Sequence, residues 1–391
     1  MKYLFKHIKG DKTLWGLIVF MCVLSFMPIY SASSNLQYVV NNGTTIGHLV
    51  KHAIMVFGGI AILTYVPRIP YKWFGNLSMI LLVVSVFLLV VTLAQGNTIG
   101  GANASRWLRL PGIPVSFQTS TFASVSLLIY VSRYLYEHRD SIIDIKESAL
   151  RLWLPVFLVV ALIFPANFST ALLILISVTM LLVLGGYPMK YLIGLGGLAF
   201  VGISLFILTV KAFPDLMDNR VDTWMSRIES FVEDDEEESY QVRQAKIAIA
   251  TGGLTGLGPG KSVQKNFLPQ SSSDFIFAIV IEEYGMIGGA VVMLFYIIML
   301  QRFMIIARKA NNEFGTLLVV GLGMPIIIQA LLNMMVATNL VPVTGQTLPF
   351  VSSGGTSLWM TCAALGIILS VSAATQEREA SEELELLQAD D

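Results

Sequence analysis

The chain has 391 residues, of which 55% are hydrophobic and only 13% are charged. Soluble domains carry about 25% charged residues, so this chain has too little polar side chain to cover a water-soluble core of its size. Its net charge of −1 provides no field that would attract nucleic acid. The composition therefore excludes an ordinary soluble enzyme, a disordered protein and a basic nucleic-acid binder. Cys22 and Cys362 lie in apolar runs and predict neither a disulfide framework nor a metal site.

Apolar runs of about 20 residues, the length that crosses a bilayer, recur along the chain. They predict an all-α, polytopic membrane protein with ten transmembrane helices. We expect these helices at 13–31, 47–66, 75–94, 117–136, 152–166, 168–186, 189–210, 275–300, 315–338 and 355–373. A tight turn is predicted between the fifth and the sixth, at Pro165. The fourth is rich in Ser and Thr, which predicts contacts with other helices more than with lipid.

Lysine and arginine are distributed unequally between the two sets of loops. With the N-terminus inside, fifteen of them fall on the inner side, and only Arg106 and Arg109 fall in short outer loops. Because positively charged loops stay in the cytoplasm, both termini are predicted to be cytoplasmic. The polar connection 211–274, between helices seven and eight, is then extracytoplasmic. A polar connection of that length in a compact bundle is usually functional or disordered.

The domain organisation predicted from these features is simple. Residues 1–373 are expected to form a single membrane domain, and the acidic tail 374–391 a disordered cytoplasmic end. The acidic run 233–238 within the long outer loop is expected to be solvated. No internal repeat is evident, which argues against a transporter built from inverted repeats.

Charged groups inside hydrocarbon are costly and therefore informative. Of the 26 acids, only Glu282 and Glu283 fall inside an apolar span, and Asp274 stands at the outer mouth of the same helix. Asp274 could cap the helix, bind a cation or accept a proton from a hydroxyl, and its position alone favours capping. Glu282 lies about 12 Å further along the helix, too deep to share a proton with Asp274. Glu282 or Glu283 is expected to pair with a buried donor and to fix helix packing.

Two basic stretches have alternative explanations. Five glycines between 252 and 260 precede Lys261 and Lys265, but no flanking strand supports a phosphate-binding P-loop. These glycines permit close backbone approach, which leaves a diphosphate site and a plain flexible turn both open. Arg106 and Arg109 oppose the charge rule for outer loops. An outer anion, a buried acid or interfacial snorkelling would each explain them.

The segment 339–357 carries no charge, and its prolines and glycines break the helix at membrane depth or at the membrane face. Irregular backbone in that position must line a cavity or pack within protein, because its amides need partners. Packing is the favoured interpretation, and a polar cavity wall is the alternative.

These stretches together resemble the FtsW/RodA/SpoVE family of cell-wall polymerases, over about residues 10–372. The most specific similarities are 342–357 and 268–288. The run 342–345 and the compact inner loops are more similar to the division member than to the elongation member of the family. Shorter similarities lie at Arg106-Trp107, Phe117-Gln118, 165–171 and 240–260.

The sequence departs from the family pattern at several positions. Thr119–Thr121 and Ser124 stand where the family has an acid and then a lysine, so no charged role carries over to the fourth helix. Asn167 replaces an aspartate, which excludes acid–base work at that position. Ser353 stands where tyrosine is common.

The resemblance implies an enzyme, a peptidoglycan glycosyltransferase that polymerises lipid II at the outer face of the cytoplasmic membrane, during septal synthesis in cell division. The family's catalytic aspartate falls on Asp274. As general base it would deprotonate the acceptor sugar, undecaprenyl diphosphate would leave, and the configuration would invert. A cation must stabilise the leaving group, and the candidates are Arg106, Arg243, Lys261 or a divalent ion, Mg²⁺ or Mn²⁺. Ser352, Gly354 and Gly355 are expected to bind substrate.

The resemblance also implies partners: lipid II, the growing glycan strand, membrane lipids, a class B penicillin-binding protein that acts as transpeptidase, and other division proteins. No organic cofactor, no nucleic acid and no protein metal cage are expected. The elongation-type polymerase is one alternative. A lipid II flippase and a scaffold that only recruits other proteins are alternatives from other functional classes.

Overall fold

The computed structural model describes residues 9–38, 44–95, 98–99, 102–103, 107–109, 116–139, 145–212, 240–268 and 271–389. Arg106 and the acidic run 233–238 lie outside the described residues. A helix stands at each of the ten positions expected from the apolar runs. In chain order these are α2 (Lys12–Tyr38), α3 (Thr45–Tyr65), α4 (Tyr71–Gln95), α5 (Thr119–Glu137), α7 (Leu154–Ile163), α8 (Phe168–Leu184), α9 (Met189–Ala212), α12 (Ile276–Lys309), α13 (Glu313–Ala337) and α14 (Thr356–Ala389).

Within the described part of the chain, six of these helices are long and apolar enough to cross a membrane, namely α2, α3, α4, α12, α13 and α14. Helix α8 is a shorter apolar helix. Helix α7 is preceded by one turn of α6 (Ile145–Ser148) and by a π-helical turn, η2 (Ala149–Trp153). The predicted tight turn at Pro165 is confirmed. Asn167 ends it by capping α8, its side chain accepting a hydrogen bond from the backbone N–H of Thr170.

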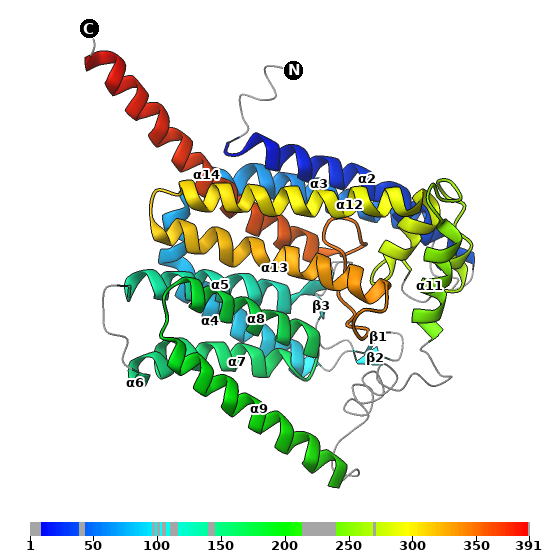
Figure 1. The fold of residues 1–391 in the computed structure, drawn as a ribbon, viewed down its shortest axis with the longest axis horizontal. Helices are drawn as coiled ribbons and strands as arrows, with labels where there is room; N and C mark the ends of the chain where they lie inside the picture. The colour runs from blue at the N-terminus through cyan, green and yellow to red at the C-terminus, as the bar shows by residue number, and fades with distance from the viewer. Residues whose placement is uncertain are drawn as a thin grey trace.

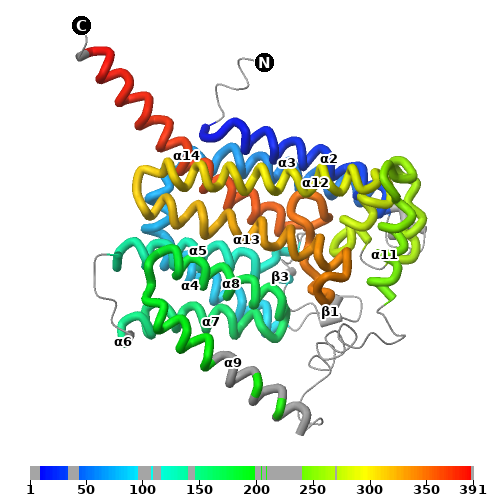
Figure 2. The backbone as a smooth tube through the Cα atoms, in the orientation of Figure 1, coloured from blue at the N-terminus to red at the C-terminus, as the bar shows by residue number. Residues whose placement is uncertain are grey.

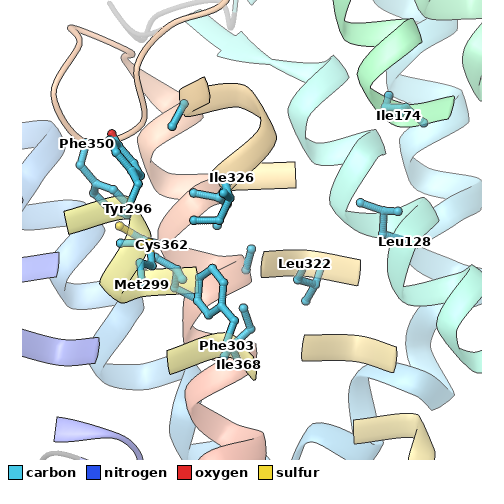
Figure 3. Packing of buried hydrophobic residues seen from close by; sticks show 14 of the residues in the cluster. Leu128, Ile174, Tyr296, Met299, Phe303, Leu322, Ile326, Phe350, Cys362 and Ile368 are labelled. Atoms are coloured by element: carbon cyan, nitrogen blue, oxygen red, sulfur yellow. The ribbon is translucent and has the colours of Figure 1, made fainter. Parts of the chain in front are cut away.

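The long helices run side by side, and α5 lies among them (Figure 1). Most of α5 is buried, including its serines, as the Ser- and Thr-rich sequence predicted. Small hydroxyl side chains can form a hydrogen bond to a carbonyl of their own helix, as Ser132 does when it donates to the carbonyl of Leu128. The largest fully buried side chains include Tyr296 and Phe303 of α12, and Tyr296 lies next to Phe350 (Figure 3).

One end of the bundle is held together by ion pairs. Asp11 caps α2 by accepting from the backbone N–H of Leu14 at 2.7 Å, and it also pairs with Arg302 near the end of α12. Lys9 pairs with Glu377 at 3.0 Å, which places the start of α2 beside the C-terminal half of α14. The two ends of the described chain therefore lie at the same end of the bundle (Figure 2).

The predicted disordered tail is not seen, because α14 continues as one helix to Ala389 (Figure 1). The extension is anchored at its base. Besides the Lys9 pair, Lys309 contacts Glu379 at 3.0 Å, and Arg378 contacts Glu382 one turn away. Glu, Leu, Gln and Ala are good helix formers, so the helix propagates from an apolar span that is already helical.

The polar connections contain more secondary structure than the sequence predicted. Between α4 and α5 lie two pairs of short antiparallel strands, β1 (Thr98–Ile99) with β2 (Ala102–Asn103) and β3 (Trp107–Arg109) with β4 (Ser116–Gln118). In the connection predicted at 211–274, the described residues form α11 (Tyr240–Gly252) and a 3₁₀ turn, η4 (Gln264–Asn266). Helix α11 packs against α12.

Candidate active site

Asp274 lies in a turn that directly precedes α12. The N-cap position of α12 is Phe275, so Asp274 stands one residue outside the place from which a side chain caps a helix. The Asp274 side chain is half-buried. Its own backbone carbonyl accepts a hydrogen bond from the side-chain amide of Asn333 on α13, at 2.7 Å.

The uncharged segment before α14 wraps around this turn. The Ser352 hydroxyl donates to the carbonyl of Ser273 at 2.6 Å and accepts from the backbone N–H of Leu348 at 2.8 Å. Ser353 donates to the carbonyl of Ser272 through both its backbone N–H and its hydroxyl, each at 2.9 Å. The two residues before Asp274 are thus fixed by the segment that sequence similarity singled out.

The same segment brings backbone close to the carboxylate. A Cβ on Gly345, which has a φ of +66°, would lie 3.5 Å from Asp274 Oδ2. The next residue, Gln346, donates from its side chain to the Thr170 hydroxyl at 3.0 Å, and its carbonyl accepts from Asn333 at 2.7 Å. Helices α8 and α13 and the uncharged segment therefore set the position of Asp274 together.

The glycine-rich loop is bound to α12, and we call residues 252–268 together with the break in α12 the glycine clamp. Helix α12 is interrupted at Gly285, whose φ of +70° and ψ of −175° are non-helical. A Cβ on Gly285 would meet the Leu254 carbonyl at 2.1 Å, and one on Gly256 would meet the Glu283 carbonyl at 2.2 Å. The close backbone approach that these glycines permit is made to α12, a contact that neither the diphosphate site nor the flexible turn had included.

Hydrogen bonds close the glycine clamp. The backbone N–H of Leu257 donates to the Glu282 carbonyl, and that of Met286 donates to the Gly253 carbonyl, both at 2.9 Å. The Glu282 carboxylate accepts from the Ser262 hydroxyl and from the backbone N–H groups of Val263 at 3.0 Å and Gln264 at 3.2 Å. The expectation that Glu282 meets buried donors and fixes packing is confirmed.

Glu283 joins the glycine clamp to α2, since its Oε1 accepts from the backbone N–H of Ser262 in the loop, at 3.3 Å. The same oxygen accepts from the Ser31 hydroxyl, and the Lys265 ammonium also contacts that hydroxyl, at 3.2 Å. Lys265 donates as well to the carbonyl of Gly260, at 2.8 Å. One basic residue of the loop is thus used inside the glycine clamp.

A cavity of about 210 Å³ reaches the Asp274 turn at Ser272. It is formed by α2, α3, the β3–β4 pair, the Ser272 turn and the start of α14. No carboxylate is among its lining residues. These are Ile29, Ser33, His48, Lys51, His52, Met55, Trp107, Ser116, Ser272, Ser353, Gly354, Gly355 and Thr356.

The predicted site residues fall into separate groups. Gly354 and Gly355 line this cavity, whereas Ser352 is buried and holds the Ser273 carbonyl. Arg243, on α11, and Lys261, which lies over Gly258, are exposed and are not among the lining residues. Arg106 lies outside the described residues, although its neighbour Trp107 lines the cavity.

Sequence reasoning missed the contribution of α3, which supplies His48, Lys51 and His52 to the cavity. The signal was present, because Lys51 is a charged residue within an apolar run. The described residues contain no group of three or more His, Cys, Asp or Glu side chains able to hold a metal ion. Among the described residues at this end, Asp274 is the carboxylate that lies outside the glycine clamp, and for these residues Mg²⁺ or Mn²⁺ would need substrate phosphates as further ligands.

Comparisons with known proteins give a consistent result. The family model for FtsW/RodA/SpoVE, described as cell cycle protein, matches residues 11–377. A probable peptidoglycan glycosyltransferase FtsW of Hydrogenovibrio crunogenus is 31% identical over 94% of this chain and 92% of its own length. The stage V sporulation protein E of Bacillus subtilis is 31% identical over 81% of this chain and 85% of its own length.

Solved structures share the fold. A chain from a peptidoglycan synthase complex, in a study of how polymerization and crosslinking are coordinated, superimposes with a TM-score of 0.72 at 24% identity. It covers 94% of this chain and 98% of its own length. The rod shape determining protein RodA of Thermus thermophilus gives a TM-score of 0.65 at 25% identity, covering 93% of this chain and 96% of its own.

Proposed function

The chain belongs to the FtsW/RodA/SpoVE family of membrane proteins, and on that premise we propose that it polymerises lipid II into glycan strands as a peptidoglycan glycosyltransferase of cell division. Relatives named FtsW match most of the chain at 31–32% identity. The observation that carries the mechanism is the half-buried Asp274 carboxylate, held at the mouth of α12 beside a polar cavity.

Asp274 acts as the general base in this proposal. It accepts the proton of the acceptor sugar hydroxyl while the hydroxyl oxygen attacks the anomeric carbon of the donor. The bond from that carbon to the diphosphate breaks on the opposite face, and the configuration inverts. Asn333 and Ser352 fix the backbone on each side of Asp274, which supports precise placement of the carboxylate.

The membrane topology is also part of the proposal. We assign ten spans in one membrane domain, with both termini in the cytoplasm, from the excess of Lys and Arg on one side. The clustering of ion pairs around Asp11, Lys9 and Lys309 at the end that holds both termini supports this orientation. Asp274 and the cavity then open at the outer face of the cytoplasmic membrane, where the division septum forms.

We further propose that a class B penicillin-binding protein binds this chain and crosslinks its product, as the similarity to a chain of a peptidoglycan synthase complex supports. A divalent cation, Mg²⁺ or Mn²⁺, fits as a component that arrives with the substrate phosphates. Asp274 would be its protein carboxylate ligand. When bound, such an ion would supply charge stabilisation to the leaving diphosphate.

The test is a lipid II polymerisation assay with the purified full-length chain, run with and without the transpeptidase and with and without a chelator. Glycan strands are expected from the wild-type protein. Asp274→Ala is expected to lower the rate at least about 100-fold, because a general base contributes about 10²–10⁴-fold. Thermal unfolding of the variant in detergent should match the wild type.

Three outcomes would contradict the proposal. Normal polymer from Asp274→Ala would remove the carboxylate from the mechanism. Movement of lipid II across liposomes by a wild-type protein that makes no polymer would favour the flippase instead. Complementation of cells by Asp274→Ala would favour a scaffold.

A further inference from the structure

Lys51 is a charged residue inside a membrane helix that the proposed mechanism leaves without a role. It lies about two turns into α3, and its side chain is exposed. Charged side chains within membrane helices are costly, so they are rare and usually mark functional sites. Among the described residues, no ion pair or hydrogen bond engages the Lys51 side chain.

The side chains around Lys51 have the chemistry of an anion site. His48 lies one turn before it on α3, and Ser33 and Ser272 bring hydroxyls to the same cavity. The Thr356 hydroxyl, also on the cavity wall, instead donates to the Ser116 carbonyl at 3.0 Å. The cavity also includes backbone of Gly355, whose φ is +55°. Lysine binds phosphate as a point charge, and hydroxyls supply donors. Because the lining contains no carboxylate, a cation would find no counter-charge here.

The size of the cavity limits what it can hold. At about 210 Å³ it is smaller than the roughly 300–1,000 Å³ of pockets that bury drug-sized ligands. A disaccharide with its peptide and lipid cannot fit inside, but a compact anionic group can. His52 is not needed for charge, since it is buried, contacts the Ser25 hydroxyl at 2.8 Å and packs against Phe26.

The cavity is close to Asp274 along the chain. Ser272, on its wall, is two residues from Asp274, so their Cα atoms are at most about 7 Å apart. In transfer from a diphosphate-linked sugar, the diphosphate is bonded to the carbon that is attacked. An anion site this close to the base therefore suits the leaving group of the donor, whereas the diphosphate of the acceptor lies a disaccharide away from the reacting hydroxyl.

We propose that Lys51, with His48 and the hydroxyl of Ser272, binds the diphosphate of the polyprenyl-linked donor. The proposal rests on the glycosyltransferase function described above. As the bond from the anomeric carbon to the diphosphate oxygen breaks, its electron pair moves to the diphosphate, and the Lys51 ammonium stabilises that charge. The acceptor proton passes to Asp274. Lys51 thus takes a role for which the sequence had offered Arg106, Arg243, Lys261 or a divalent ion.

The test measures binding of farnesyl diphosphate, farnesyl monophosphate, farnesol and inorganic pyrophosphate to the full-length protein in detergent. The variants are Lys51→Met, which removes the charge at similar length, Lys51→Arg, which keeps it, and His48→Gln. Lys72→Met is the matched control, because Lys72 is an exposed lysine at the first turn of α4 and does not line the cavity. Thermal unfolding verifies that each variant is folded.

Wild-type protein is expected to bind the diphosphate more tightly than the monophosphate, and the monophosphate more tightly than farnesol. Lys51→Met should weaken the binding of farnesyl diphosphate at least about 10-fold and leave the binding of farnesol unchanged. His48→Gln should lose less diphosphate affinity, and Lys51→Arg and Lys72→Met should bind the diphosphate nearly as well as the wild type. The polymerisation rate of Lys51→Met should fall about 100-fold, the size of the loss when one donor to a developing anion is removed. Weaker binding of inorganic pyrophosphate in Lys51→Met would show that the phosphates alone are recognised, and unchanged pyrophosphate binding would show that the lipid must be attached.

Equal diphosphate affinity in Lys51→Met and wild type would overturn the proposal, as would an equal loss for farnesol, which would indicate a packing role. Two further outcomes distinguish the anion site from the polymerase function. Charge-dependent diphosphate binding by a protein that makes no polymer would reject the polymerase and keep the anion site. Normal polymerisation by Lys51→Met would reject the anion site and keep the polymerase.

Discussion

Two regions at the same end of the bundle contain charged side chains within apolar helices, and they differ in what surrounds the charge. In the glycine clamp, the Glu282 carboxylate accepts hydrogen bonds from Ser262, Val263 and Gln264. In the cavity, no side chain of the described residues pairs with Lys51, which faces space lined by hydroxyls. A charge in a membrane helix therefore indicates a ligand site only where the protein itself does not supply the partner.

The comparison predicts that substitutions in the glycine clamp reduce stability and substitutions at the cavity reduce activity. The largest loss of stability is expected from Glu282→Ala. It leaves one hydroxyl and two backbone donors without their acceptor, at about 1–3 kcal/mol for each buried group. Unfolding of the purified variant in detergent should show at least about 3 kcal/mol of destabilisation.

Glu282→Gln is the control for this variant. Because its amide keeps one oxygen acceptor, it should be destabilised less than Glu282→Ala. Polymerisation per folded molecule should stay near the wild-type rate in both. If Glu282→Ala were as stable as wild type but made no polymer, Glu282 would belong to the chemistry of the site and the contrast between the regions would fail.

A smaller loss is expected from Gly285→Ala. The φ and ψ of Gly285 lie in a region accessible essentially to glycine alone, which costs about 1–3 kcal/mol for other residues, and the new Cβ would meet the Leu254 carbonyl at 2.1 Å. We expect a destabilisation of at least about 2 kcal/mol. Gly16→Ala is the matched control, since a Cβ at Gly16 on α2 has no neighbour within 4 Å. Equal stability of the two variants would show that the clamp is not held by close backbone contact.

The smallest change in stability is expected from Ser352→Ala, about 1–2 kcal/mol, because one hydroxyl with two hydrogen bonds is lost. Its effect on catalysis is more informative. With Ser273 no longer held, Asp274 is less well placed, so kcat should fall about 10-fold while KM for lipid II changes little. Ser353→Ala is the control, since its backbone N–H still holds Ser272. A rise in KM alone would instead restore the substrate-binding role that the sequence predicted for Ser352.

Much of the fold followed from local patterns. Each apolar run became a helix, and Asp274 was found at the mouth of α12, because run length and the position of the first polar residue are properties of adjacent residues. The prediction of a disordered tail was wrong, because the helix found there continues from α14 and is held by ion pairs to Lys9 and Lys309. These two lysines are distant from the tail in sequence. The C-terminal helix is thus a tertiary result as much as a local one.

The sequence by itself determined the helical membrane architecture, the family and the candidate base, since hydrophobic length, charge distribution and motif order can all be read along the chain. Only the tertiary structure decided which polar residues meet. The glycines after α11 found their partner in the α12 backbone, and Lys51 on α3 came to share a cavity with Ser272 and Thr356. Such pairings join residues that are not adjacent along the chain, and packing rather than local sequence selects them.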